Sequence, residues 1–301
     1  MKVLCFGSLN IDYTYSVDHF VQKGETLSST SLQVFTGGKG LNQSIALAKA
    51  GAEVYHAGAI GPDGRFLLTA MEQAGVDTRY VSVLEDARTG NAIIQRDKDG
   101  DNCILLYGGT NQMITEQQID DVLAHFDRGD YLILQNEINN LPYLMRRAHE
   151  KGMVVALNPS PMNEKIPALP LDFVDLFLLN EVEARQILSR SDDTAHEELA
   201  KALLERFPGA VIVLTLGGDG SLCIDKDGCL TQGAFRVEVA DTTAAGDTFT
   251  GFLIGGLLSG KDRKTAMREA SAAAAIACSR PGAAPSIPTP DEVQAFLRQR
   301  A

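Results

Sequence analysis

The chain has 301 residues, of which 45% are hydrophobic, 22% charged and 6% aromatic, and it contains no tryptophan. This composition is typical of globular proteins and excludes the disordered, collagenous and disulfide-scaffold classes. The 27 lysines and arginines against 39 aspartates and glutamates give a net charge of −12, which disfavours a nucleic-acid partner and an anionic membrane surface.

The first third of the chain contains alternating polar and apolar segments rather than successive helices. Residues 91–95 and 103–107 flank a turn-rich tip at 97–101 and predict a hairpin. Together with 13–17 and 31–35, they predict a small antiparallel sheet that projects from the main body. Such a sheet buries little by itself, so we expect it to cover a ligand, a partner subunit or both.

From residue 131 onward, short apolar runs alternate with amphipathic helical patterns. The predicted strands are 131–134, 153–157, 176–179, 211–214 and 235–239, and the predicted helices are 142–151, a helix from 181, and 197–206. Buried strands separated by helices indicate an α/β fold, a doubly wound and mostly parallel sheet with helices on both faces. We expect one domain over 1–301, with the strands of the small sheet inserted at about 12–36 and 90–108. Ligands of such sheets bind beyond the carboxyl ends of the strands.

Neither the cysteines nor the amino terminus indicates a secreted or membrane protein. The five cysteines include no pair with the spacing of a zinc or redox motif, and we expect reduced, buried thiols. The first apolar run is too short for a secretory signal, and the apolar stretches 251–258 and 272–278 are shorter than the about 20 residues that span a bilayer. We therefore expect a cytoplasmic protein.

The most informative segment is 241–251, Asp-Thr-Thr-Ala-Ala-Gly-Asp-Thr-Phe-Thr-Gly, which opens an apolar helix. The small residues at 244–246 let the backbone approach a ligand, and the first amides of the helix have no intrahelical partner. The turn therefore predicts an anion site with Asp247 beside it. A lone aspartate here would more simply cap the helix, but two acids six residues apart around a small-residue turn favour the anion site.

A second glycine-rich segment, 37–43 (Gly-Gly-Lys-Gly-Leu-Asn-Gln), precedes a helix predicted over 44–50. The side chain of Asn42 can donate and accept hydrogen bonds, as a polyol ligand requires. The segment alone is equally well explained as a tight turn. It matches neither the dinucleotide fingerprint nor the Walker pattern, and the nearer Walker match at 255–261 fails because Asp262 occupies the Ser/Thr position. A dinucleotide dehydrogenase is therefore disfavoured.

Three further segments follow predicted strands. Residues 180–183 (Asn-Glu-Val-Glu) begin a helix, and a simple helix cap also explains them. The glycine loop at 215–220 suits a nucleotide or a bare turn. Glu137 follows the strand at 131–134, so it lies at the same carboxyl edge.

Segments 37–43, 180–183 and 241–251 resemble the signature segments of the PfkB, or ribokinase-like, family of carbohydrate kinases. The resemblance extends over nearly the whole chain, from 7–12 to 283–286. It implies an ATP-dependent kinase that phosphorylates the primary 5-hydroxyl of D-ribose and uses ATP, Mg²⁺ and K⁺.

The resemblance also implies roles for individual residues. Asp247 matches the catalytic base that takes the proton of the sugar hydroxyl as it attacks the γ-phosphate, and the anion hole and its turn match Ala244, Ala245 and Gly246. The sugar-binding positions are Asn10, Asp12, Gly38, Lys39, Asn42, Glu137 and Asp247. The positions for the nucleotide and its Mg²⁺ are Asn180, Glu183, Thr215, Gly217, Gly218, Gly220, Gly246 and Ser271. The K⁺ positions, mostly through backbone oxygens, are Asp241, Thr243, Ala277, Arg280, Gly282 and Ser286.

Other interpretations remain open. A kinase of the same family could act on 2-deoxyribose, another sugar or a nucleoside, although the low aromatic content disfavours a base-stacking pocket. A non-catalytic sugar or nucleotide sensor could keep the fold. We also expect a homodimer through the small sheet, because its second apolar face and its strand edges need cover. The same sheet is predicted to close over the sugar as a lid.

Overall fold

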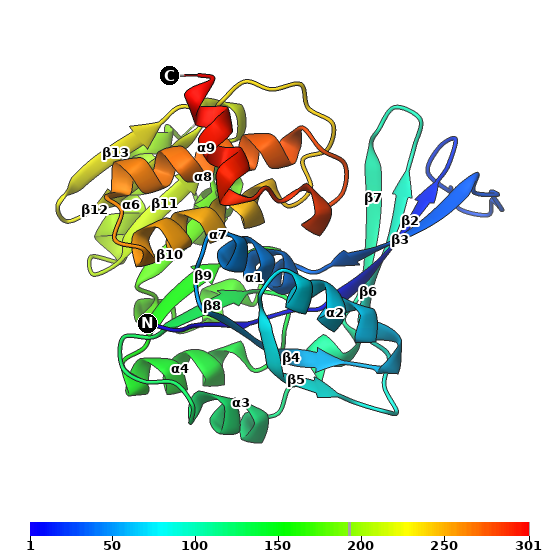
Figure 1. The fold of residues 1–301 in the computed structure, drawn as a ribbon, viewed down its shortest axis with the longest axis horizontal. Helices are drawn as coiled ribbons and strands as arrows, with labels where there is room; N and C mark the ends of the chain where they lie inside the picture. Colours follow the sequence, from blue (N-terminus) through cyan, green and yellow to red (C-terminus); the bar gives the residue numbers. More distant parts are fainter. Residues whose placement is uncertain (192–193, 301) are drawn as a thin grey trace.

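The larger sheet of the computed structural model has nine strands over the described residues, 1–191 and 194–300 (Figure 1). Their order is β13-β12-β11-β10-β9-β8-β1-β4-β5. Neighbours from β5 to β11 pair in parallel, whereas β12 and β13 are antiparallel. The strands are β1 Val3–Phe6, β4 Val54–Ile60, β5 Asp77–Val83, β8 Tyr131–Gln135, β9 Val154–Asn158, β10 Leu176–Asn180, β11 Val211–Thr215, β12 Ser221–Asp225 and β13 Gly228–Gln232. The predicted doubly wound, mostly parallel sheet is confirmed.

Helices cover both faces of this sheet (Figure 1). Within β8, Leu132 and Leu134 belong to a buried cluster with α3, α4 and α6, whereas Ile133 belongs to a second cluster with α1, α2, α7, α8 and α9. Successive side chains of a strand point to opposite faces, so a strand buried on both sides is apolar throughout. The α-helices are α1 Lys39–Lys49, α2 Arg65–Gln73, α3 Glu116–Leu123, α4 Leu141–Lys151, α5 Glu181–Leu188, α6 His196–Arg206, α7 Ala245–Leu258, α8 Arg263–Cys278 and α9 Pro290–Arg298.

A second, four-stranded sheet projects from one side of the main body (Figure 1). Its order is β3-β2-β6-β7, with β2 Asn10–Ser16, β3 Ser31–Gly37, β6 Gly90–Arg96 and β7 Asn102–Tyr107. The outer pairs β2–β3 and β6–β7 are antiparallel, as the hairpin pattern predicts, and the central pair β2–β6 is parallel. The projecting sheet grows out of the loop after β1, so its base lies at the carboxyl edge of the larger sheet.

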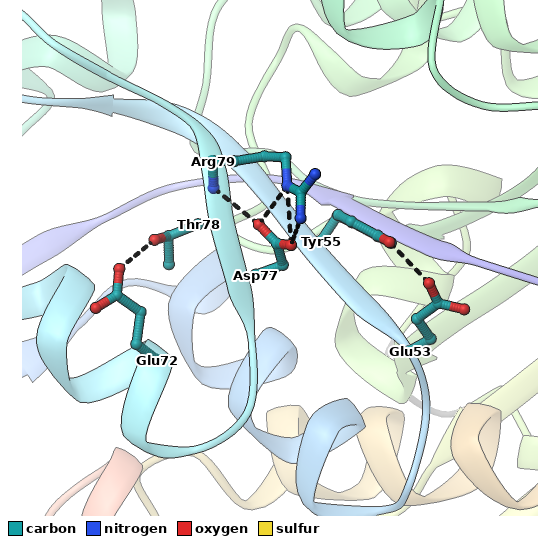
Figure 2. A network of polar contacts seen from close by, with 6 residues as sticks. All are labelled: Glu53, Tyr55, Glu72, Asp77, Thr78 and Arg79. Atoms are coloured by element: carbon teal, nitrogen blue, oxygen red, sulfur yellow. Dashed lines mark hydrogen bonds and ion pairs between the residues drawn. The ribbon is translucent and has the colours of Figure 1, made fainter.

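Strand β5 forms one free edge of the larger sheet, and charged side chains occupy its surface (Figure 2). The guanidinium of Arg79 donates to Asp77 at 2.6 Å and lies 5.7 Å from the ring centre of Tyr55. The Tyr55 hydroxyl donates to Glu53 at 2.7 Å. Charges on an edge strand hinder its pairing with a strand of another molecule.

Two expectations are wrong. The strand predicted at 235–239 does not form. Residues 233–239 are not part of a strand, and the larger sheet ends at β13, which lies beside β12. The apolar pattern there reflects other contacts: the ring of Phe235 packs against Phe296 of α9, with centroids 5.5 Å apart. The thiols of Cys103 and Cys229 are exposed rather than buried, since they lie on the edge strands β7 and β13. Among the described helices, none is both long and apolar enough to cross a membrane.

Candidate active site

The glycine-rich segment leads directly into α1, which begins at Lys39, earlier than the predicted 44–50. Gly38, at the N-cap, has a φ of 94°, a conformation that favours glycine. Gly40 lies in the first turn, where an added Cβ would be 2.7 Å from the Cα of Gly7. This contact, which only glycine permits, places the start of α1 against the loop after β1.

The segment 241–251 forms a turn followed by α7. Ala244, at the N-cap of α7, has a φ of 60°, which is rare for a residue with a Cβ. Such strained residues concentrate at functional sites. A Cβ added to Gly246 would meet no atom within 4 Å, so the space beside the first turn is open. The turn therefore has the geometry of an anion-binding helix N-terminus.

Asp247 is buried in the first turn of α7. Its Oδ2 accepts a hydrogen bond from Asn42 Nδ2 at 3.1 Å, and its Oδ1 accepts one from Gln43 Nε2 at 2.9 Å. The two helices approach closely at Gly251, where an added Cβ would lie 2.7 Å from the carbonyl carbon of Ala46. Sequence reasoning identified Asn42 and missed Gln43, whose place beside Asn42 on α1 was its only signal.

The buried amide of Asn42 also holds an unused acceptor. In the described part of the chain, no group donates to its Oδ1, although that atom is shielded from solvent. Buried polar atoms without a partner are uncommon and destabilising. The Oδ1 of Asn42 is therefore suited to accept a hydrogen bond from a ligand hydroxyl.

Two carboxylates and one lysine surround this point. Burial raises the pKa of Glu137, whose Oε2 accepts hydrogen bonds from the Ser8 hydroxyl and, at 2.9 Å, from the amide of Lys39. Burial, and then the charge of Glu137, raise the pKa of Asp12 to about 7. Burial opposes the charged form of Lys39, but Asp247 and Glu137 raise its pKa above the usual value. The site thus holds a cation among acids.

The predicted sugar-binding residues are brought together at the base of the projecting sheet. Asn10 begins β2, directly after the loop that follows β1. Its backbone nitrogen lies 3.0 Å from the position that a Cβ on Gly38 would take. The Oδ1 of Asn10 accepts a hydrogen bond from Asn111 Nδ2 at 2.8 Å. Contacts or charge interactions link Asn10, Asp12, Gly38, Lys39, Asn42, Glu137 and Asp247 into one cluster. Sequence reasoning missed Ser8 and Asn111, which contact this cluster, and Gln135, which contacts Gln43.

A cavity of about 830 Å³ borders the N-terminus of α7. Of the predicted nucleotide positions, those that line it are Asn180, Thr215, Gly217, Gly218, Gly220, Gly246 and Ser271. A Cβ on Gly217 or Gly218 would meet nothing within 4 Å, so these glycines leave room in the cavity. Apolar side chains that the sequence did not single out complete the wall: Val182, Phe235, Val237, Val239 and Ala274.

Glu183 does not line this cavity. Its carboxylate accepts a hydrogen bond from the backbone N–H of Asn180 at 3.0 Å. In return, the side-chain Oδ1 of Asn180 accepts one from the backbone N–H of Glu183 at 2.9 Å. This reciprocal pair is a capping box at the start of α5, so the simpler explanation of the segment also holds. Burial raises the pKa of Glu183, although the Asn180 amide opposes that shift.

Asp241 joins two loops beside the anion-binding turn. Its Oδ1 accepts from the amide of Thr243 at 2.9 Å, and its Oδ2 accepts from the amide of Gly282 at 3.1 Å. Burial raises its pKa, but the hydrogen bond from the Thr243 hydroxyl, together with those from the two amides, outweighs burial and holds the pKa below the usual value. Nearby, the Ser286 hydroxyl donates to the Ala283 carbonyl at 2.7 Å.

The remaining predicted K⁺ positions lie at the end of α8 or in the loop between α8 and α9. The Ala277 carbonyl accepts from the amide of Arg280 at 3.1 Å, and the Arg280 side chain pairs with Glu292 at 2.6 Å. Among the described residues, no group of three or more His, Cys, Asp or Glu could hold a metal ion.

Comparison with known proteins extends over nearly the whole chain. The family model described as pfkB family carbohydrate kinase matches residues 1–290. The ribokinase of Haemophilus influenzae is 35% identical over 297 residues, which cover 97% of this chain and 96% of the relative. A deoxyribokinase of Salmonella typhi is 27% identical over 303 residues, 99% of each chain. The structure of Arabidopsis thaliana ribokinase complexed with ribose and ATP has a TM-score of 0.87 at 28% identity and covers 99% of this chain and 98% of its own. The chain therefore belongs to the pfkB family of carbohydrate kinases.

Proposed function

We propose that the chain transfers the γ-phosphoryl group of ATP to the 5-hydroxyl of D-ribose and releases ribose 5-phosphate and ADP. The observation that carries this proposal is the position of Asp247: its carboxylate belongs to the polar cluster, and the helix turn that holds it borders the cavity. The relatives named ribokinase, and the Arabidopsis structure complexed with ribose and ATP, support ribose as the sugar.

Asp247 takes the proton of the 5-hydroxyl as that oxygen attacks the γ-phosphorus, and the bond to the leaving ADP oxygen breaks. Phosphoryl transfer depends mainly on positioning and on stabilising the charge of the transferred group. The amides at the start of α7, at Ala245, Gly246 and Asp247, are oriented before the reaction and serve this purpose.

The sugar is held by groups that accept and donate hydrogen bonds in a buried setting. Asp12 and the unused Oδ1 of Asn42 accept from adjacent ring hydroxyls. A sugar that lacks one of these hydroxyls would leave a buried acceptor without a partner, which costs affinity. The sugar site is completed by Asn10, Gly38, Lys39 and Glu137. The projecting four-stranded sheet acts as the lid of this site. Sheet and main body form a single kinase domain, 1–301.

ATP occupies the cavity of about 830 Å³, whose open glycines leave room for the nucleotide. Thr215, Gly217, Gly218, Gly220 and Ser271 contact it. When bound, Mg²⁺ neutralises charge on the phosphates. Asn180 and Glu183 supply oxygen atoms of the kind that Mg²⁺ prefers, and they would hold it through water, since this ion keeps much of its hydration shell.

A monovalent cation, K⁺, would bind behind the anion-binding turn. Asp241 supports this proposal because its Oδ2 accepts one hydrogen bond, from the amide of Gly282, and keeps a second lone pair for a cation. The cation would stiffen the loop that presents the α7 amides. The other residues of this site are Thr243, Ala277, Arg280, Gly282 and Ser286.

A homodimer through the lid is supported by apolar side chains exposed on the four-stranded sheet. Leu105 is 67% exposed and Tyr107 57%. Leu105 is paired in register with Ile93 of β6, so these two side chains share one face of the sheet. Exposed apolar surface of this kind is typical of interfaces. The other exposed apolar residues of the lid are Leu32, Val34, Ile93, Ile104 and Leu106.

A coupled assay of ADP release tests the function with D-ribose, 2-deoxyribose, fructose and ribonucleosides. We expect the highest kcat/KM with D-ribose. Preference for 2-deoxyribose would instead favour the activity for which the Salmonella relative is named. Sugar and ATP binding without turnover would identify a sensor and contradict the proposal.

A further inference from the structure

A chain of buried amide side chains leads from Asp247 into the core. Gln43 of α1 donates its Nε2 to Asp247 Oδ1 at 2.9 Å. The Oε1 of Gln43 accepts from Nε2 of Gln135, the last residue of β8, at 2.7 Å. The same Nε2 of Gln135 also donates to the Cys5 sulfur at 3.7 Å. Gln43 is 0% exposed and Gln135 1%.

The chemistry of Asp247 determines which group donates and which accepts in this series of hydrogen bonds. An ionised carboxylate only accepts hydrogen bonds, so Gln43 must turn its NH₂ group toward Asp247. The carbonyl of Gln43 then faces away and needs a donor, which Gln135 provides. Gln135 therefore prevents the amide of Gln43 from flipping into the orientation that would face Asp247 with an oxygen.

Gln135 is only partly satisfied in the core. Its Nε2 donates to Gln43, but within the described residues its Oε1 is buried and has no donor. This oxygen lies against Gly7, where a Cβ would overlap it. A buried acceptor without a partner destabilises a fold, which offsets part of what the hydrogen bond to Gln43 contributes. A glutamine here is consistent with a role in the reaction.

We propose that Gln43 and Gln135 are positioning residues for the catalytic base: Gln43 holds the Asp247 carboxylate through Oδ1, and Gln135 acts through Gln43. The inference rests on the proposed function. Asn42, the other donor to Asp247, also contacts the sugar in that function and must adjust when sugar binds. Gln43 makes no such contact, so it keeps the carboxylate oriented throughout the reaction.

Gln43→Met, Gln135→Met and the double variant test this role, because methionine keeps the length and removes the amide. We expect Gln43→Met to lower kcat by about tenfold or more, as displacement of a reacting group does, with the KM for ATP unchanged. Gln135→Met should lower kcat by a smaller factor, roughly threefold to tenfold. The double variant should match Gln43→Met, since Gln135 acts only through Gln43.

Unfolding in urea distinguishes positioning from a structural role. Gln135→Met should change the free energy of unfolding little, because it removes one unpartnered acceptor and leaves another, the Oε1 of Gln43, without its donor. The matched control is Gln118→Met on α3, whose Nε2 donates to the Gly58 carbonyl at 2.8 Å and not to Asp247, Gln43 or Gln135. The control should lose stability and keep its kcat.

Several results would overturn the inference. One is an unchanged kcat in both glutamine variants when the wild type is active; another is losses that multiply in the double variant. If Gln43→Met fails to fold, the kcat and stability of Gln135→Met decide alone. A wild-type chain that phosphorylates none of the sugars contradicts the proposed function and, with it, the positioning role.

Discussion

Affinity for the sugar should depend on pH near neutrality because of Asp12. Burial and the neighbouring Glu137 raise the pKa of Asp12 to about 7 in the ligand-free protein. The ionised carboxylate accepts hydrogen bonds from sugar hydroxyls more strongly than the protonated acid does. Ribose affinity should therefore rise as the pH increases through this range and fall as the pH decreases.

The pKa shift of Asp12 sets the size of the effect. With a pKa of about 7, the ionised fraction of Asp12 is about 0.09 at about pH 6 and about 0.9 at about pH 8. If only the ionised form binds, the Kd for ribose should fall about tenfold between these two values. The free energy of unfolding should show the matching pH dependence. Because the pKa of Asp12 is raised, the sugar-free protein becomes less stable as the pH rises from 3.8 toward about 7. Bound ribose should therefore stabilise the protein more at the higher pH.

Calorimetric titration of ribose into nucleotide-free protein measures this dependence without the ionisation of ATP. Asp12→Asn is the control, since the amide does not titrate: its affinity should be lower and nearly independent of pH. A flat profile for the wild type, or an unchanged slope in Asp12→Asn, would refute the assignment of this titration to Asp12.

Four further predictions follow from the site and the fold. Asp247→Asn should lower kcat by about 10²-fold or more while ATP affinity is kept, and activity within a few fold of wild type would contradict its role as the base. Gly40→Ala should lower the free energy of unfolding by about 1–3 kcal/mol in urea titrations, because its Cβ would meet the backbone of the loop after β1; an unchanged midpoint would count against that contact. We expect the wild type to sediment as the proposed dimer and Leu105→Asp as a monomer; a wild-type monomer at micromolar concentration would exclude the lid interface. Activity should be higher in K⁺ than in Na⁺ at constant ionic strength, Asp241→Ala should abolish that difference, and equal wild-type rates would show that the cation site is absent.

Local patterns were sufficient where neighbouring residues determine the conformation. The strand β8 and the helix α4 follow from an apolar run and a helical period, and Gly152 ends that helix with a φ of 74°, as its position predicts. The alternating segment at 235–239 misled, because alternation indicates only that every second side chain is covered. Here Phe235 packs against α9, and Val237 and Val239 line the cavity instead of joining a sheet.

The fold class, the family and the residues of the local motifs follow from the sequence alone, because the turn before α7 and the glycines before α1 carry their chemistry within a few positions. Which groups hold Asp247 depends instead on three-dimensional packing. Its partner Gln43 is 204 residues away in the chain, and Gln43 in turn meets Gln135 across 92 residues. The raised pKa of Asp12 likewise depends on burial and on Glu137, which no local pattern encodes. Contacts between segments distant in sequence arise from packing of the helices on the sheet, and packing also sets the burial that shifts a pKa.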